Sequence, residues 1–410
     1  MIAIKEKVYE LTISKSAIWV FYTICYVVID CLPVVKYSVP YVVAGLFSLI
    51  PLIIVAFYDQ KYCKLLVMFC ILGFIHGFLY FVNGYATWTE IINEPIRCIR
   101  YFIPCVLFDK LCYASEKKKV LVWLFITVLF LFVAISTLVG VSQNPMLARL
   151  LATGESMSEE IAAYRFQNAA GFEFCYALSF TTPLWTYLLV RGKSIMKFLT
   201  LFPLLFVFYF ALQVQYMTLL LICIASIFLV LLFCAKGIFK KISAILISAI
   251  ILVLLPTIMR EIANSGVEYI LRTKLNNMAD VLEGKLGLGD TTSRTELYFK
   301  AFETFLTNPF VGSANSDNVI KAHSTIFGTL ASTGLIGSIS IFYGMYFCCS
   351  QTVILLKKKA NSLSVYNICI VLFVILMFVN PIHYAYEISI VMFLYIPLTM
   401  LIFKPRLTVK

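Results

Sequence analysis

The feature that most constrains this chain is a series of long apolar runs that recur from one end of the sequence to the other. A helix that spans a bilayer needs about 20 mostly apolar residues, and runs of this kind occur throughout the 410 residues. Hydrophobic residues make up 61% of the chain and charged residues only 13%, with a mean hydropathy of +0.94. A soluble globular protein of this size is far more polar. The sequence therefore predicts an all-α polytopic membrane protein with about 12 transmembrane helices.

Twelve spans are predicted from these runs. They are residues 17–33, 38–58, 64–83, 98–113, 120–141, 168–190, 198–213, 216–235, 242–259, 325–349, 364–380 and 388–403. The predicted organisation has three parts: 1–259 with transmembrane helices 1–9, 260–323 as a large external or periplasmic loop with amphipathic helices, and 324–410 with transmembrane helices 10–12. The polar N-terminus has no small-residue cleavage site behind its apolar run, so the first helix is expected to be an uncleaved anchor.

The distribution of basic residues predicts the orientation. If the N-terminus is cytoplasmic, the inner segments carry 21 of the 33 Lys and Arg residues, and every inner segment is basic. The short outer segments carry only five, which are Lys36, Arg97, Arg100, Arg149 and Arg165. Both termini are therefore expected in the cytoplasm. The net charge of +12 is attributed to this topology, and nucleic acid is not an expected partner.

The 260–323 loop is too long for a simple turn, and its sequence is not of low complexity. "VEYILRTKLNNMADVLEG" has apolar residues at helical spacing. "TTSRTELYFKAFETFLTNP" has Thr and Ser cap candidates, an apolar face and an Asn-Pro stop. Two amphipathic helices are expected there, lying over the outer mouth of the bundle. The outer segment 142–167 is also longer than a turn.

His323 is the first candidate for chemistry, in "KAHSTIFGTLASTGLIG" (321–337). It precedes a predicted span that is rich in Gly, Ala and Ser, and small residues let helices pack closely. A tightly packed helix would then present the imidazole to an outer cavity, where it could accept a proton near neutral pH. The structural alternative is an interfacial histidine that hydrogen-bonds a loop carbonyl.

Arg294 and Arg165 are the next candidates. Guanidinium groups bind phosphate through two parallel hydrogen bonds and keep their charge. Two of them over an outer cavity could hold a diphosphate. The alternative is that each snorkels or pairs with a nearby acid, such as Glu160 or Glu296.

Arg100, Glu173, His76 and His383 are weaker candidates. Arg100 and Glu173 fall inside or near apolar runs, where charged groups usually face the bundle interior. For each of these residues satisfied packing is the simpler interpretation. No nucleotide-binding glycine motif, HExxH motif or paired-acid motif is found, and the 13 cysteines lie in or beside apolar runs. No cofactor and no metal are therefore expected.

Four elements between Ser293 and Gly337 together resemble the core of the O-antigen polymerase/ligase family of bacterial membrane glycosyltransferases. They are "SRTELYFKAF", "NPFVG", "AHSTIF" and "LASTGLIG", in this order. "YRFQNAAGF", before the sixth span, is similar to the other arginine segment of that family. The chain departs from the family pattern at Ser324, where Asn is common, and at the turn "QVQYMT", which lacks the usual Ser-Arg pair.

The resemblance implies a C-type glycosyltransferase architecture and a glycan donor linked to undecaprenyl diphosphate. An acceptor hydroxyl would displace the diphosphate without a metal and with inversion at the anomeric carbon. Arg294 and Arg165 would stabilise the leaving group, Lys321 and Arg100 would help, and His323 would act as the base or orient the hydroxyl. Glu173 and His383 are the further substrate-binding candidates.

The expected function is polymerisation of O-antigen or capsule repeat units at the outer face of a bacterial cytoplasmic (inner) membrane. Two alternatives stay open from sequence: an O-antigen ligase of the same family, and a flippase for lipid-linked oligosaccharides. A non-catalytic assembly protein is a third. The expected partners are the lipid-linked oligosaccharides and the bilayer, with a chain-length regulator and a flippase as candidates.

Overall fold

The structure is a computed structural model of the chain. It describes residues 2–82, 88–144, 147–153, 159–192, 194–214, 216–234, 238–266, 269–283, 290–313, 324–359, 363–382 and 385–403. Within these ranges the only regular secondary structure is helical, and no strand occurs. The predicted all-α class is confirmed.

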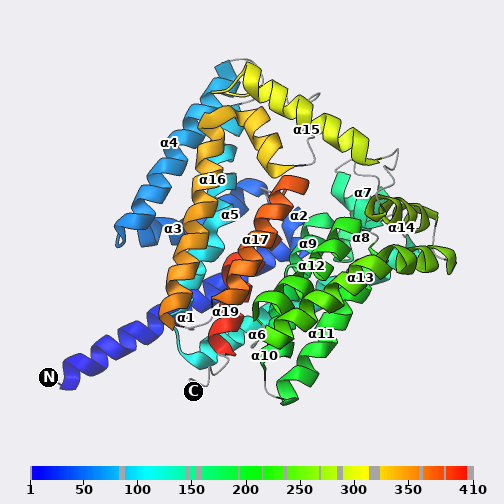
Figure 1. Ribbon diagram of the computed structural model, residues 1–410. Helices are drawn as coiled ribbons and strands as arrows, with labels where there is room; N and C mark the ends of the chain where they lie inside the picture. Colours follow the sequence, from blue (N-terminus) through cyan, green and yellow to red (C-terminus); the bar gives the residue numbers. More distant parts are fainter. Residues whose placement is uncertain are drawn as a thin grey trace.

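The described helices follow one another along the chain (Figure 1). In the first half of the chain they are α1 (Ile2–Cys31), α2 (Pro33–Ser38), α3 (Tyr41–Ala56), α4 (Gln60–Val82), α5 (Trp88–Leu111), α6 (Glu116–Gln143), α7 (Leu147–Thr153), α8 (Glu159–Phe166), α9 (Phe172–Ser179) and α10 (Thr182–Arg191). In the second half they are α11 (Ser194–Gln213), α12 (Met217–Cys234), α13 (Ile238–Asn264), α14 (Tyr269–Leu282), α15 (Asp290–Thr307), α16 (Thr325–Lys359), α17 (Ser364–Val379), α18 (Tyr386–Ile390), the π-helical turn η1 (Val391–Tyr395) and α19 (Ile396–Ile402).

Each of the twelve predicted spans falls on one helix or on consecutive helices. The sixth is interrupted between α9 and α10, where Pro183 has no N–H to donate, and the twelfth is α18, η1 and α19 in succession. By length and composition, two of the described helices could cross a membrane, Glu116–Gln143 and Thr325–Lys358. The number of twelve spans stays a prediction.

The last helical segment lies at the centre of the bundle. Every residue from Ala385 to Leu401 is buried, so α18, η1 and α19 are enclosed on all sides. Aromatic side chains from different helices pack around this segment. Phe393 lies 6.1 Å from Phe373 of α17, and Tyr395 lies 6.2 Å from Phe130 of α6, measured between ring centroids. A polar group on this segment is therefore shielded from solvent unless a cavity reaches it.

Two prolines shape the connection between α1 and α3. Pro33 disfavours helix at Leu32, which is extended and ends α1, and Pro33 itself starts α2 at a position where no N–H is needed. Pro40 acts in the same way on Val39 and ends α2. The sequence "LPVVKYSVP" thus forms a six-residue helix between two breaks, and this short helix carries Lys36 and Tyr37.

Two helices form in the 260–323 loop, as predicted. α14 folds back onto α13, where Arg260 pairs with Asp280 at 2.8 Å and with Glu283 at 2.6 Å. α15 packs on α16 through a small contact area in which Ala301 and Ala331 are fully buried. Phe302 and Leu306, on the apolar face of α15, are 46% and 60% exposed.

The segment "LASTGLIG" is not the continuous packed helix that its small residues suggested. Gly334 interrupts α16 with φ 60° and ψ −163°, a backbone conformation that is essentially restricted to glycine. The residues that follow α15 fill this break. The N–H of Leu335 donates to the carbonyl of Pro309 at 2.9 Å, and the N–H of Ile336 donates to Phe310 at 3.1 Å. "NPFVG" and "LASTGLIG" therefore form one joint between α15 and α16.

Gly334→Ala is expected to lower the free energy of unfolding by about 2 kcal/mol, because a methyl group at this φ is strained and would overlap the backbone of Phe310 and Val311. Gly266→Ala is the matched control, since Gly266 has a φ of 87° but no atom within 4 Å of the added Cβ. The control should lose only the cost of the left-handed backbone conformation, about 1 kcal/mol. Chemical denaturation in mixed micelles measures both. Equal losses in the free energy of unfolding would mean that the residues after α15 do not pack against Gly334.

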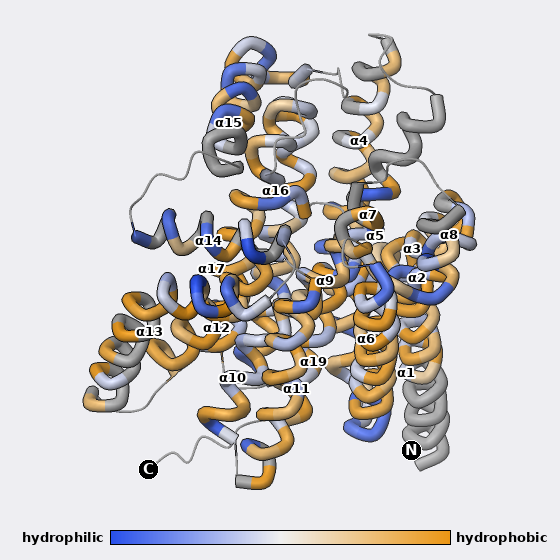
Figure 2. The backbone as a smooth tube through the Cα atoms, turned by 90° about the vertical axis from the view of Figure 1, so that its right-hand side faces the viewer, coloured by the Kyte–Doolittle hydropathy of each residue, from blue (hydrophilic) through white to orange (hydrophobic). Residues whose placement is uncertain are grey.

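Large apolar side chains lie on the outside of the bundle as well as in its core. Most of α6, α11, α12 and α13 is hydrophobic in Figure 2, whereas hydrophilic residues gather on α2, α8, α14 and α15. Exposed examples are Phe21 (68%), Phe202 (70%) and Val253 (73%). Large exposed apolar surfaces of this kind are typical of sites that contact a membrane or another protein.

Candidate functional site

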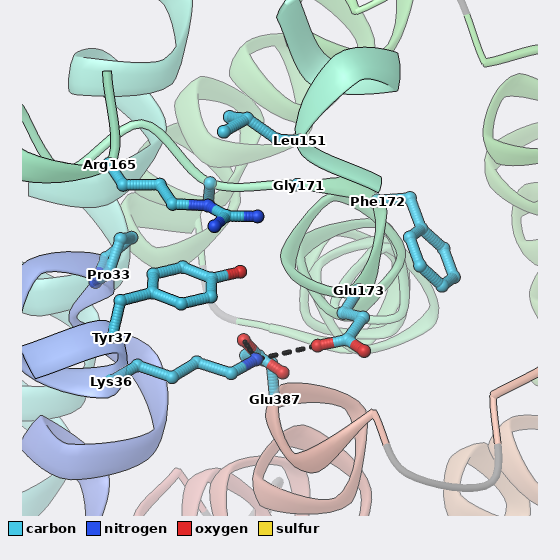
Figure 3. Close-up of a pocket in the computed structure, with 10 residues that line it drawn as sticks. Pro33, Lys36, Tyr37, Leu151, Arg165, Gly171, Phe172, Glu173 and Glu387 are labelled. Atoms are coloured by element: carbon cyan, nitrogen blue, oxygen red, sulfur yellow. Dashed lines mark hydrogen bonds and ion pairs between the residues drawn. The ribbon is translucent and has the colours of Figure 1, made fainter. Parts of the chain in front are cut away.

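A cavity of about 190 Å³ opens where α2, the α7–α9 region and the start of α18 meet. Its lining is unusually rich in ionisable groups for a chain of this composition (Figure 3). The lining residues are Pro33, Lys36, Tyr37, Leu151, Arg165, Ala170, Gly171, Phe172, Glu173 and Glu387. Segments more than 200 residues apart in the sequence thus contribute to one polar site.

Lys36 bridges two carboxylates inside this cavity. Its Nζ lies 2.7 Å from Glu173 Oε2 and 2.7 Å from Glu387 Oε1. The side chains of Lys36, Glu173 and Glu387 are 17%, 31% and 6% exposed, respectively, so the bridge is deepest at Glu387. Burial lowers the pKa of Lys36, but the two carboxylates outweigh that effect and raise it well above its usual value. The lysine is therefore positively charged over the whole physiological pH range.

The two carboxylate oxygens of Glu387 differ in their hydrogen bonding. Oε1 accepts from Lys36, whereas Oε2 is buried and makes no hydrogen bond within the described part of the chain. Buried polar atoms are normally hydrogen-bonded, and an ionised oxygen left without a donor is costly. The residue lines the cavity and is only 5% exposed. An acceptor without a donor, on a residue that lines a cavity, is typical of a site that binds a hydrogen-bond donor.

Arg165 lies on the opposite side of the cavity from Glu387 (Figure 3). Its guanidinium is 4.1 Å from the centre of the Tyr37 ring, a cation–π arrangement that fixes the plane of the group. Arg165 is near the end of α8, which Asn168 closes with a left-handed φ of 64°. The Asn168 side chain then accepts a hydrogen bond from the N–H of Val34 at 3.2 Å. One asparagine thus ties α8 to α2 and holds Arg165 next to Tyr37.

Asn168→Ala is expected to lower the free energy of unfolding by about 1–2 kcal/mol, because it removes the bond to Val34 and places alanine at a positive φ. Asn168→Gly keeps the backbone conformation and loses only the bond, so its loss should be smaller. The two variants are compared by thermal denaturation in detergent. A larger loss for glycine than for alanine would contradict this role of Asn168.

A second buried ion pair lies next to the cavity. Arg100 binds Asp30 through its Nε at 2.9 Å and also through Nη2, and both residues are buried. The Arg100 guanidinium packs 4.4 Å from the centre of the Tyr386 ring, adjacent in sequence to Glu387. Arg100 is not among the residues that line the cavity. Arg100 thus joins α1, α5 and α18 through Asp30 and Tyr386, and its role as a substrate ligand stays a prediction.

The candidates chosen from sequence have different outcomes. Arg165 and Glu173 meet in one cavity. The backbone of Arg294 lies in the first turns of α15, but its side chain, like that of His76, is outside the described part of the structure. Lys321, His323 and His383 lie outside the described residues. Whether Arg294 and His323 face Arg165 stays a prediction.

The described residues that follow His323 are hydrogen-bonded to the segment that precedes Glu387. The N–H and the hydroxyl of Thr325 both donate to the carbonyl of Asn380, at 3.0 and 2.8 Å, and the hydroxyl accepts from the N–H of Ile382 at 2.7 Å. The Ser324 hydroxyl donates to the carbonyl of Met377 at 3.2 Å. The start of α16 is thus fastened to the turn that precedes α18.

Sequence analysis did not single out Lys36, Tyr37 or Glu387. A usable signal exists for two of them, since Lys36 is a cation in a short outer turn and Glu387 is an acid at the edge of an apolar run. Ionisable residues in such positions are usually functional or paired. Tyr37 has no comparable signal, because tyrosine is common at the ends of membrane helices.

The described residues contain no group of three or more His, Cys, Asp or Glu side chains able to hold a metal ion. The expectation of metal-free chemistry stays a prediction. No protein-family model matches the chain, and comparisons with curated proteins and with solved structures also gave no match.

Proposed function

We propose that this protein is a bacterial membrane glycosyltransferase that polymerises surface-polysaccharide repeat units carried on undecaprenyl diphosphate. The observation that carries the proposal is the cavity in which Arg165 faces a lysine-bridged pair of carboxylates. Arg165 belongs to the segment "YRFQNAAGF", which resembles the arginine segment of the O-antigen polymerase/ligase family. The joint between "NPFVG" and "LASTGLIG" is a second support, because two segments chosen for that resemblance bind each other.

Contacts across the bundle support the proposed topology. Every lining segment of the cavity belongs to a predicted outer segment or to the outer end of a predicted span. At the opposite ends of the helices, Asp109 contacts Lys61 at 3.8 Å and Lys110 at 3.5 Å. Lys61 belongs to a predicted inner segment, and Asp109 and Lys110 lie at the inner end of the fourth predicted span. Lys118 and Ser16, at 2.6 Å, are also both on the predicted inner side. The exposed apolar side chains on the outside of the bundle favour a bilayer as their surroundings.

The proposed reaction is a displacement at the anomeric carbon of the lipid-linked glycan. A hydroxyl oxygen of the acceptor forms the new C–O bond, and the bond from that carbon to the phosphate oxygen breaks. The electron pair leaves with the diphosphate, whose charge Arg165 is oriented to stabilise. The hydroxyl proton passes to a base, for which His323 is proposed. Arg294 and Lys321 are proposed as further phosphate ligands.

The test uses purified protein with defined undecaprenyl-diphosphate oligosaccharides and no added metal. A ladder of products is expected, and it should be lost in His323→Ala and Arg294→Ala proteins that still elute as folded material. A single product on another acceptor would instead indicate the ligase. Absence of any glycosidic bond in an otherwise folded preparation would refute the proposal.

A flippase is the second candidate, and specific observations favour it. The buried Asp30–Arg100 pair and the interrupted helix α16 are features that transporters also use. The two candidates differ in their product. Proteoliposomes that move a labelled lipid-linked oligosaccharide across the bilayer without bond formation would favour the flippase. Bond formation without movement would favour the polymerase.

A further inference from the structure

The cavity contains a buried acceptor that lacks a donor. Glu387 Oε2 makes no hydrogen bond with any described residue, and the residue is only 5% exposed. The Lys36 ammonium does not donate to this oxygen. Instead it binds Oε1 of Glu387 and Oε2 of Glu173, at 2.7 Å each. A ligand in the cavity that donates a hydrogen bond would remove this cost.

The charge of the lining favours a neutral ligand. Burial raises the pKa of Glu387 to about 7. Above that pH, Lys36 and Arg165 carry one positive charge each and Glu173 and Glu387 one negative charge each, so the formal charges of these four groups cancel. With these charges balanced, neither an anion nor a cation gains a net Coulomb attraction from the lining as a whole. A neutral ligand with several hydroxyl groups can donate to the carboxylates and accept from both cations.

The volume of the cavity and its aromatic lining residues favour a ligand that consists of one ring. A volume of about 190 Å³ is below the range typical of sites for drug-sized ligands, so it suits a small ring better than a chain of several. Tyr37 and Phe172 add aromatic surface to the polar lining. Tyr37 is 46% exposed, so part of its ring is available at the edge of the site. Apolar walls with a few fixed polar groups are the usual construction of a small-molecule site.

We propose that this cavity binds a single neutral sugar ring, with one sugar hydroxyl donating to Glu387 Oε2 and others contacting Glu173, Lys36 and Arg165. Identification of this ring as the sugar that accepts the glycan rests on the proposed function; the binding itself does not. Arg165 then lies between the ring and the space beyond the cavity, where the diphosphate of the donor would approach. Glu387 fixes the orientation of the acceptor hydroxyl.

The test measures binding separately from transfer. Saturation-transfer difference NMR on the purified full-length protein in detergent uses glucose, galactose, mannose, rhamnose and N-acetylglucosamine as probes, with glucuronate, glucosamine and pyrophosphate as charged comparisons. At least one neutral sugar should bind in a saturable manner and more tightly than its charged analogues. Glu387→Gln should weaken that binding about tenfold or more, because a hydrogen bond to a charged acceptor is lost. Glu261→Gln, at an exposed carboxylate of α13, is the matched control and should bind as the wild type does.

Tyr37→Ala provides a second variant if Glu387→Gln fails to fold, since Tyr37 is partly exposed at the edge of the cavity. It should also weaken sugar binding. Unchanged binding in folded Glu387→Gln protein, or no binding of any neutral sugar, would overturn the inference. Binding of pyrophosphate in place of sugars would overturn it while leaving the glycosyltransferase proposal intact. Sugar binding by a protein that forms no glycosidic bond would support the inference and refute the glycosyltransferase.

Discussion

Lys36→Met is expected to lower the free energy of unfolding by about 3–5 kcal/mol, because it removes one partner of a buried ion pair and leaves Glu173 and Glu387 uncompensated. The three side chains are between 6% and 31% exposed, so water replaces the lost charge poorly. Adding Glu387→Gln to Lys36→Met should restore a substantial part of the loss, since it removes the more buried carboxylate. Chemical denaturation in mixed micelles measures the free energy of unfolding of the wild type and of these variants.

Lys61→Met is the matched control for that loss. Lys61 also contacts two acids, Asp59 at 3.5 Å and Asp109 at 3.8 Å, but its side chain is 34% exposed and the contacts are longer. Its replacement should cost about 1 kcal/mol or less. Equal losses at positions 36 and 61, or no recovery in the double variant, would mean that the bridge in the cavity does not stabilise the fold.

Arg165→Ala is expected to reduce transfer from lipid-linked oligosaccharides by about 10²–10³-fold, the effect of removing one preorganised group that stabilises developing charge. The protein should stay folded, because the fixed contacts between α8 and α2 include the Asn168 bond, which the substitution leaves in place. Arg165→Lys keeps the charge but loses the planar group stacked on Tyr37, so its activity should lie between those of alanine and the wild type.

Arg191→Ala serves as the control for Arg165→Ala. Arg191 ends α10 and belongs to a predicted inner segment, so transfer at the opposite end of the bundle should be unaffected. Rates are measured on the same lipid-linked substrate for all variants. Wild-type activity in folded Arg165→Ala protein would exclude Arg165 from the reaction.

Much of the helical architecture could be predicted from local sequence. Apolar runs of about 20 residues and helical spacing located the helices, including α14 and α15 in the long loop. Arg165 was chosen because a guanidinium group in an outer segment can bind phosphate. Glu173 was chosen because charged residues near apolar runs usually face the bundle interior, and both residues line the cavity. These predictions depend on patterns within about 20 residues of one another.

The rest depends on contacts between distant segments. Lys36 and Glu387 are 351 positions apart, and nothing in the sequence around either residue indicates the other. Arg100 was an ambiguous case for the same reason, since its partner Asp30 is 70 positions away. Neither the cavity nor the pairing of Arg100 with Asp30 could be deduced before the helices were packed.

The break in α16 illustrates a different difficulty. Gly334 was read with its neighbours as a stretch of small residues that favours close helix packing. In the structure its absence of a side chain serves a left-handed backbone conformation and contact with the backbone of Phe310. The same residue type satisfies both requirements, so composition alone cannot distinguish a packed helix from an interrupted one.

The most direct test of the central claim is site-specific photo-crosslinking at the cavity. Tyr37 is replaced by benzoylphenylalanine in the full-length protein, which is then illuminated with undecaprenyl-diphosphate oligosaccharide labelled in its glycan. Replacement of Tyr346, 68% exposed on α16, provides the control on the apolar outer surface. If the cavity is the site of transfer, the glycan label should attach at position 37 well above the level at position 346, and unlabelled substrate should compete. Equal labelling at the two positions, or none at position 37, would contradict a glycan site between Arg165 and Glu387.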